Sequence, residues 1–198
     1  MSTRDEILAR IRKNQPAPVA MPVLPAFAEA GVPAAKSWLE GFKAGLERMG
    51  ATYVRAPADG DLTALVRRLF PDAAVVCSAA PEVAGNRPLA DVREPRELDD
   101  VDVGVVRAAF AVAETGSLVL TDAHFQVSAL GFLAQHLVVL LDPAHIVANL
   151  HSAYRDPLFR DARYAVFMTG PSATADIEGV LIHGAQGIRS LTVVSAPV

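Results

Sequence analysis

The sequence of 198 residues contains a single cysteine, Cys77, and this scarcity excludes several kinds of protein. One thiol cannot form an internal disulfide, nor can it supply the ligands of an all-cysteine zinc site or an iron–sulfur cluster. The five histidines also lack the i, i+4 spacing by which a helix presents two metal ligands. We therefore expect no metal and no cofactor in this chain, and any iron–sulfur cluster would belong to a partner protein.

Positive charge is scarce as well, because 18 Lys and Arg residues face 22 Asp and Glu residues and no basic tract occurs. A nucleic-acid-binding protein needs a clustered basic face, so we expect no nucleic-acid partner. A secretory signal is also missing, since Asp5 and Glu6 lie close to the N-terminus and no apolar run follows them. The sequence thus predicts a cytoplasmic protein.

Long apolar runs without polar side chains are absent too. Residues 123–141 carry no charge and approach the length of a membrane span. They include polar residues such as His124 and Gln135, and no Lys or Arg anchors flank them. This pattern indicates a buried helix followed by a buried strand, and we expect no membrane span.

Apolar residues are nevertheless abundant, at 52% of the chain with a mean hydropathy of +0.29. Short runs of Val, Leu and Ile, such as VDVGVV and HLVVLL, alternate with segments of helical periodicity. Such runs are typical of parallel strands whose two faces are both covered. The sequence predicts an α/β fold, in which one three-layer domain with a mainly parallel sheet includes helices at 34–49, 107–113 and 175–183.

The N-terminal 33 residues differ from the rest of the chain. Thr3 and Glu6 match a capping box, and apolar residues then fall on one side of a helix predicted over 3–13. Five prolines follow between residues 14 and 33 and exclude regular structure there. We expect residues 1–33 to form a helical arm, able to pack on a second copy of the chain, and residues 34–198 to form the α/β domain.

The segment AVAETGSLVL contains the first candidate site. No Lys or Arg occurs between residues 107 and 155, and Glu114 is one of only three acids there. Gly116 permits a tight turn, while Thr115 and Ser117 offer hydroxyl groups and backbone N–H donors to a ligand. A carboxylate in so apolar a region suits acid–base work or attack on an acyl group. It suits equally well a structural role, as the cap of a neighbouring helix or the partner of an arginine.

The segment YAVFMTGPSATADIEGV contains the second candidate site. It runs from a strand through a turn into the predicted helix, with the residues Gly170, Pro171, Ser172, Thr174, Asp176 and Glu178. A helix N-terminus presents free N–H groups and the positive end of a dipole, so this turn is suited to hold a phosphate or a carboxylate. The same residues also compose an ordinary N-cap followed by acids that complement the dipole.

Two segments, AETGS at 113–117 and GPSATADIE at 170–178, resemble the signature segments of the lactate utilisation protein C family, the LUD-domain proteins. The usual form in that family is AETGT and GPSRTADIE, followed by VHGPR. The N-terminal DEILARIR helix is also similar. The resemblance implies a fold like that of the ribose-5-phosphate isomerase and CoA-transferase group. It also implies a role with iron–sulfur partner proteins in the oxidation of L-lactate to pyruvate.

The resemblance further implies a shared ligand pocket. Its residues would be those of the two segments and the closing stretch, namely Glu114, Thr115, Gly116, Ser117, Gly170, Pro171, Ser172, Thr174, Asp176, Glu178, Gly187 and Arg189. This chain departs from the usual form at Ala173, where arginine is usual, and at Gln186 and Ile188 within AQGIR. Because arginine and histidine are natural partners of an anion, their absence predicts a different ligand or weaker binding.

Three hypotheses follow for the function. The first is an accessory or regulatory subunit of a lactate-oxidising iron–sulfur system, with a small anionic ligand between Glu114 and the turn at 170–172. The alternative is a free-standing acyl-transfer or phosphosugar-type enzyme with Glu114 as nucleophile or base. It follows from the resemblance, because CoA transferases of similar fold use a glutamate, followed at the second position by glycine, as acyl acceptor. The third is a purely structural α/β module, which requires that neither segment opens onto a pocket.

Overall fold

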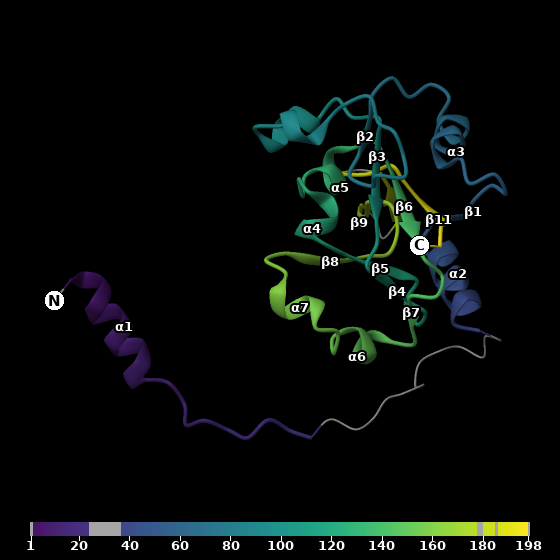
Figure 1. The fold of residues 1–198 in the computed structure, drawn as a ribbon. Coiled ribbons are helices and arrows are strands. Elements are labelled where there is room, and N and C mark those ends of the chain that lie inside the picture. Colours follow the sequence, from purple (N-terminus) through teal and green to yellow (C-terminus); the bar gives the residue numbers. More distant parts are fainter. Residues whose placement is uncertain (1, 24–36, 178–179, 185, 198) are drawn as a thin grey trace.

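The central sheet of the protein is parallel. The computed structural model describes residues 2–23, 37–177, 180–184 and 186–197. Within them a five-stranded sheet has the order β1-β11-β6-β3-β2, and every neighbouring pair is parallel (Figure 1). Its strands are β1 (Thr52–Arg55), β2 (Val76–Ser78), β3 (Val103–Arg107), β6 (His136–Leu141) and β11 (Ser190–Ser195). The predicted α/β fold with a mainly parallel sheet is confirmed.

A second sheet, of four strands in the order β7-β4-β5-β8, lies outside the sequence prediction. It contains β4 (Phe110–Val112), β5 (Ser117–Thr121), β7 (Ile146–Val147) and β8 (Ala165–Met168). Strand β5 pairs antiparallel with both β4 and β8, and β7 adds to β4 in parallel. A two-stranded hairpin, β9 (Ala173–Ile177) and β10 (Val180–His183), follows β8.

Short helices cover the two sheets. They are α2 (Trp38–Arg48), α3 (Leu62–Leu69), α4 (Asp122–Phe125), α5 (Leu130–Leu133), α6 (Leu150–Ala153) and α7 (Leu158–Asp161), with two 3-10 turns, η1 (Leu89–Asp91) and η2 (Pro95–Leu98). The largest core lies between the sheets, where Phe42 of α2 and Leu118 of β5 belong to the same buried cluster as Leu137 of β6. Helix α3 covers the other face of the central sheet, and α6 and α7 cover the outer face of the second sheet.

Residues 107–113, predicted as a helix, instead form the end of β3 and the strand β4. Phe110 and Val112 are buried beside α6 and α7, whereas Ala111 and Ala113 are buried in the core that contains α2. This alternation between two faces is the period of a strand. The prediction is wrong because pairing with β5 outweighs the helix propensity of the alanines.

Residues 175–183, also predicted as a helix, belong to the β9–β10 hairpin, with residues 178–179 outside the described part of the chain. Ile177 lies opposite Val180, and Thr174 lies opposite Ile182. These β-branched residues favour strands, because their side chains lose rotamer freedom in a helix. Within the described residues, no helix therefore begins after the turn at 170–172, so the predicted helix is wrong and this turn offers no helix N-terminus to an anion.

The two helices predicted near the N-terminus are confirmed. α1 (Thr3–Lys13) has its capping box at Ser2 and Asp5, one residue earlier than predicted. α2 falls within the predicted range 34–49, of which residues 34–36 are outside the described residues, and Gly50 follows it with a φ of +78°. α1 buries none of its residues and lies apart from the sheets (Figure 1). Its packing on a second copy stays a prediction. No helix among the residues described is both long and apolar enough to cross a membrane.

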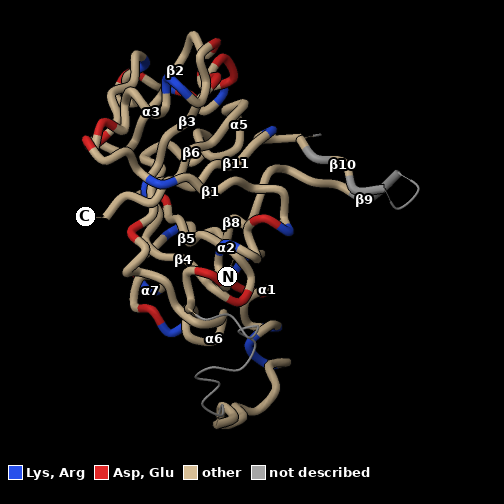
Figure 2. Tube along the Cα trace, turned by 90° about the vertical axis from the view of Figure 1, so that its right-hand side faces the viewer, with Lys and Arg blue, Asp and Glu red and all other residues tan. Residues whose placement is uncertain are grey.

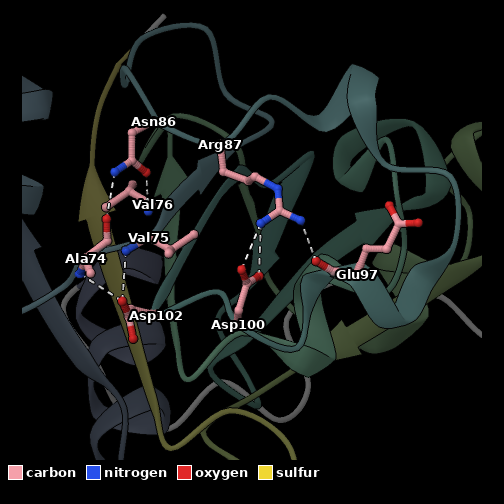
Figure 3. Close-up of polar contacts among 8 residues, drawn as sticks. All are labelled: Ala74, Val75, Val76, Asn86, Arg87, Glu97, Asp100 and Asp102. Carbon is pink, nitrogen blue, oxygen red and sulfur yellow. Dashed lines mark hydrogen bonds and ion pairs between the residues drawn. The ribbon is translucent and has the colours of Figure 1, made fainter.

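The edge strand β2 is held in place by polar side chains. One oxygen of the Asp102 carboxylate accepts hydrogen bonds from the backbone N–H groups of Ala74 and Val75, each at 2.8 Å. Asn86 and Arg87 make further contacts beside this strand (Figure 3). Figure 2 shows that charged residues gather around α3 and the segments beside β2. This end of the central sheet therefore depends on charge-assisted hydrogen bonds in addition to its core.

Candidate functional site

Glu114 lies in the turn that joins β4 to β5. Its backbone N–H donates to the carbonyl of Ala148 at 3.0 Å, and its carboxylate accepts from the backbone N–H of Leu150 at 3.0 Å. Leu150 is the first residue of α6, so the carboxylate satisfies one of the amides that a helix start leaves without a partner. This contact favours the structural interpretation of Glu114, as the cap of a neighbouring helix, over the catalytic one.

Substitutions at Glu114 separate these two roles. We expect Glu114→Ala to lower the free energy of unfolding by about 1–2 kcal/mol, because the Leu150 amide loses its acceptor. Glu114→Gln should retain most of the stability, since the side-chain carbonyl can still accept this hydrogen bond. Urea denaturation of both variants measures the difference. Equal stability of the alanine variant and the natural chain would show that the contact with Leu150 contributes nothing.

Gly116 completes the same turn and packs directly against α2. Its φ is +71°, in the left-handed region that favours glycine. A Cβ atom at Gly116 would lie 2.2 Å from the backbone nitrogen of Leu46, and a Cβ atom at Gly45 would lie 2.6 Å from the nitrogen of Gly116. The two backbones approach this closely because both residues lack a side chain. Gly116 therefore has a conformational and a packing reason to be glycine.

A row of three hydroxyl groups runs from this turn toward the second candidate segment. The hydroxyl oxygens of Thr115 and Ser117 are 2.7 Å apart, and those of Ser117 and Thr169 are 2.8 Å apart. Ser117 is buried, at 3% exposure, while the other two residues are partly exposed. Thr169 directly precedes Gly170. The two sequence segments are therefore connected by side chains, although they are far apart in the chain.

The turn at 170–172 borders a cavity of about 370 Å³. The Ser172 hydroxyl donates to the carbonyl of Gln186, and the Ser172 N–H donates to the carbonyl of Ile188 at 2.9 Å. These bonds tie the turn to the closing stretch. The cavity is lined by the predicted residues Gly170, Pro171, Ser172 and Gly187, and also by the three departures Ala173, Gln186 and Ile188. None of its described lining residues carries a charge.

Several predicted pocket residues lie elsewhere. The four residues of the first segment, Glu114, Thr115, Gly116 and Ser117, do not line this cavity. Thr174 and Asp176 belong to β9, and Glu178 is outside the described residues. Glu114 therefore does not line the cavity that Ser172 borders. The second segment does open onto one, however, and this argues against a purely structural module.

Seven lining residues were not among the predicted site residues, namely Met49, Gly131, Phe132, Val166, Phe167, Met168 and Thr169. Thr169 was detectable in principle, because it is a polar residue directly before the turn. Met49 at the end of α2 and Phe132 of α5 give no such signal, since they reach the cavity only through packing of distant segments. Gly170 shows how close this packing is, because a Cβ atom there would lie 2.5 Å from the carbonyl oxygen of Met49.

Arg189 lines a different cavity, of about 300 Å³, at the amino ends of the central strands. His136 and Asp102 line it too, and the His136 ring lies 2.7 Å from the Ser190 hydroxyl. Burial lowers the pKa of His136, the Arg189 charge lowers it further, and Asp102 partly offsets both effects. The predicted grouping of Arg189 with the turn at 170–172 is therefore not observed.

The lowered pKa values of two histidines, His124 and His136, predict how the stability of the fold depends on pH. Burial lowers the pKa of His124 as it does that of His136, and Asp122 only partly offsets this. The backbone N–H of Thr121 donates to the His124 ring, which must stay unprotonated at that nitrogen. The folded protein thus binds fewer protons than the unfolded chain, whose histidines titrate near 6.5. We expect stability to fall as the pH drops below about 6.5.

Thermal unfolding between about pH 7.5 and 5.5 measures this dependence. His124→Gln and His136→Gln should each flatten the decline in Tm, because each removes one group that takes up a proton on unfolding. His145→Gln is the matched control, since the His145 side chain is 60% exposed. An unchanged slope in both test variants would contradict the assignment.

Cys77 is a packing residue, as the sequence suggests. The side chain is completely buried in β2. Burial raises the pKa of its thiol, the Arg87 charge lowers it and Asp100 raises it, with burial dominant. A protonated, inaccessible thiol is a poor nucleophile.

Comparisons with known proteins support the family resemblance. The sequence model of the LUD domain matches residues 89–194, a range that includes both signature segments. A DUF162 family protein from Deinococcus radiodurans has a similar crystal structure, with a TM-score of 0.58 and 19% sequence identity over 80% of this chain and 95% of that chain. This likeness shows a shared fold. No curated protein matches the sequence. Since the LUD model covers more than half of its length, the chain belongs to the LUD domain family.

Proposed function

We propose that the chain is an accessory or regulatory subunit in the oxidation of L-lactate to pyruvate, acting with iron–sulfur partner proteins. Membership of the LUD domain family carries this proposal, because that family is associated with lactate utilisation. The single cysteine supports the assignment of the iron–sulfur clusters to partner proteins. One buried thiol cannot hold a cluster, so the electrons removed from lactate would pass through clusters in the partners.

The proposed contribution of this chain is a small-molecule site in the cavity beside the turn at 170–172. Its volume of about 370 Å³ falls within the range typical of such sites. A carboxylate such as lactate would depend there on backbone N–H groups and on the Thr169 hydroxyl, because the described lining is uncharged and the Ser172 hydroxyl already donates to the Gln186 carbonyl. The anionic ligand favoured by the sequence therefore receives little support from this geometry.

The geometry favours a subunit over a free-standing acyl-transfer or phosphosugar-type enzyme. Such an enzyme would use Glu114 as nucleophile or base, with the carboxylate facing a bound substrate. The carboxylate instead contacts the Leu150 amide and is not part of the cavity lining. The contact with α6 gives the Glu114 side chain a structural role as a hydrogen-bond acceptor.

Deletion of the coding sequence and growth on L-lactate test the proposal. We expect slow or absent growth on lactate, normal growth on pyruvate, and restoration by an affinity-tagged copy of the chain. The tagged chain should retain proteins that show the visible absorbance of iron–sulfur clusters. Normal growth on lactate, together with no iron–sulfur protein on the affinity resin, would exclude this function. A copy carrying Glu114→Gln should restore growth, because the helix-capping contact is kept.

A further inference from the structure

The walls of the cavity beside the turn at 170–172 are mainly apolar. The apolar lining residues include Met49 at the end of α2, Phe132 of α5, and Val166 and Met168 of β8. Met49 is 44% exposed and Phe132 is 39% exposed, so both still meet solvent at the rim. The Phe132 ring centroid lies 6.4 Å from that of Tyr164, which extends the aromatic surface. A ligand with an apolar body would remove this surface from water and gain free energy.

Charge is missing from the same walls. No described lining residue is Asp, Glu, Lys, Arg or His. Arg189, which follows the lining residue Ile188 directly, lines the other cavity. A carboxylate loses its hydration when it enters the cavity. Without a nearby cation, the few hydrogen bonds available there do not compensate for this loss. A neutral group of the same shape avoids this cost.

The cavity has few polar side chains, and they differ in the hydrogen bonds that they already make within the protein. The Ser172 hydroxyl is used in its bond to the Gln186 carbonyl. The Thr169 hydroxyl contacts Ser117, but a hydroxyl has one donor and two acceptor positions and can make a further hydrogen bond. Besides the Gln186 amide at the exposed rim, Thr169 is thus a lining side chain with hydrogen-bonding capacity left to orient a ligand in otherwise apolar surroundings.

We propose that this cavity binds an uncharged, mainly apolar small molecule through a hydrogen bond to Thr169, in preference to a carboxylate or a phosphate. This ligand class rests on the proposed function only because both place the ligand in the same cavity. Benzamide and benzoate are suitable probes, because they have nearly the same size and shape and differ in charge.

Methionine methyl NMR on the full chain reports binding at this cavity. Met49 and Met168 line it, whereas Met21, at 86% exposure in the N-terminal segment, provides an internal reference. We expect benzamide to shift the Met49 and Met168 signals saturably, with a Kd at least about tenfold lower than that of benzoate. Tighter binding of benzoate, or no shift of either signal by either probe, would overturn the proposal.

Two sets of variants locate the interaction. Thr169→Val should weaken benzamide binding by about threefold to tenfold, while Thr169→Ser should bind it like the natural chain. Ala173→Arg places a cation at the exposed rim and should shift the preference toward benzoate. Ala64→Arg adds the same charge at an exposed position of α3, which packs on the other face of the central sheet, and should leave the preference unchanged. The Ala173 comparison remains informative if Thr169→Val fails to fold.

These measurements are independent of lactate growth. A loss of growth on deletion with preferential benzoate binding would retain the proposed function and overturn the ligand class. Normal growth on lactate with preferential benzamide binding would contradict the proposed function and retain the ligand class.

Discussion

Replacing Gly116 by alanine is expected to lower the free energy of unfolding by about 2–5 kcal/mol. Two separate costs add up at this position. The φ of +71° strains any L side chain, which costs about 1–2 kcal/mol. The new Cβ atom would also lie 2.2 Å from the Leu46 nitrogen, so α2 or the turn must move. Moving a packed backbone costs about 1–3 kcal/mol more. A Tm lower by about 10 °C should result.

Gly60 offers a matched control for this prediction. Its φ of +73° is nearly the same, but nothing lies within 4 Å of a Cβ atom built there. Gly60→Ala should therefore cost only the backbone strain, about 1–2 kcal/mol. Gly45→Ala places a methyl group at the same contact from the α2 side and should also lower the free energy of unfolding. The loss should be partly offset, because alanine favours a helix more than glycine does. Equal stabilities of the Gly116 and Gly60 variants would contradict the close packing of the turn against α2.

Replacing Asp102 by alanine is expected to cost about 2–4 kcal/mol. Its carboxylate accepts from the Ala74 and Val75 amides, which lead into the edge strand β2 (Figure 3). Both hydrogen bonds are charge-assisted, and without Asp102 these two amides have only water as a substitute partner. The stability of β2 against β3 should suffer most, so hydrogen exchange of the β2 amides should accelerate more than that of β6.

Two variants test the origin of this effect. Asp102→Asn keeps an oxygen acceptor and loses the charge, so its stability should fall between those of the natural chain and the alanine variant. Asp99→Ala removes a nearby exposed acid whose side chain makes no hydrogen bond or ion pair within the described residues. It should change the stability by less than about 0.5 kcal/mol. A similar loss in both alanine variants would attribute the effect to net charge instead of the two hydrogen bonds.

The strands of the central sheet could be predicted because their sequence pattern has few competing interpretations. After its first residue β6 is a continuous apolar run, and β11 contains Leu191, Val193 and Val194; both faces of each strand are buried. β4 was missed because alanine at alternate positions also suits a helix. Its large residues, Phe110 and Val112, nevertheless have the period of a strand, and this signal was available in the sequence. The β9–β10 hairpin was missed because the turn at 170–172, which precedes it, resembles a helix start.

The candidate site could be predicted only in part, because its walls come from distant parts of the chain. Motif resemblance located Ser172 and Gly187, whereas Met49 reaches the cavity from α2. Two consecutive residues of the closing stretch even face different cavities, since Ile188 lines one and Arg189 lines another. Sequence proximity therefore could not show which of the two residues meets the ligand. The family resemblance and the α/β fold were confirmed independently of these details.

The row of hydroxyls at Thr115, Ser117 and Thr169 has a directional consequence. Each hydroxyl carries one proton, so each can donate only once. A ligand that accepts from Thr169 makes Thr169 the acceptor for Ser117, and Ser117 in turn the acceptor for Thr115. A ligand that donates to Thr169 leaves the opposite order available. Whether the bound molecule accepts or donates at Thr169 would thus set the direction of the hydrogen bonds along the row. The direction in which the Thr115 hydroxyl points, next to Glu114 in the chain, would then depend on the molecule in a cavity that Glu114 does not line.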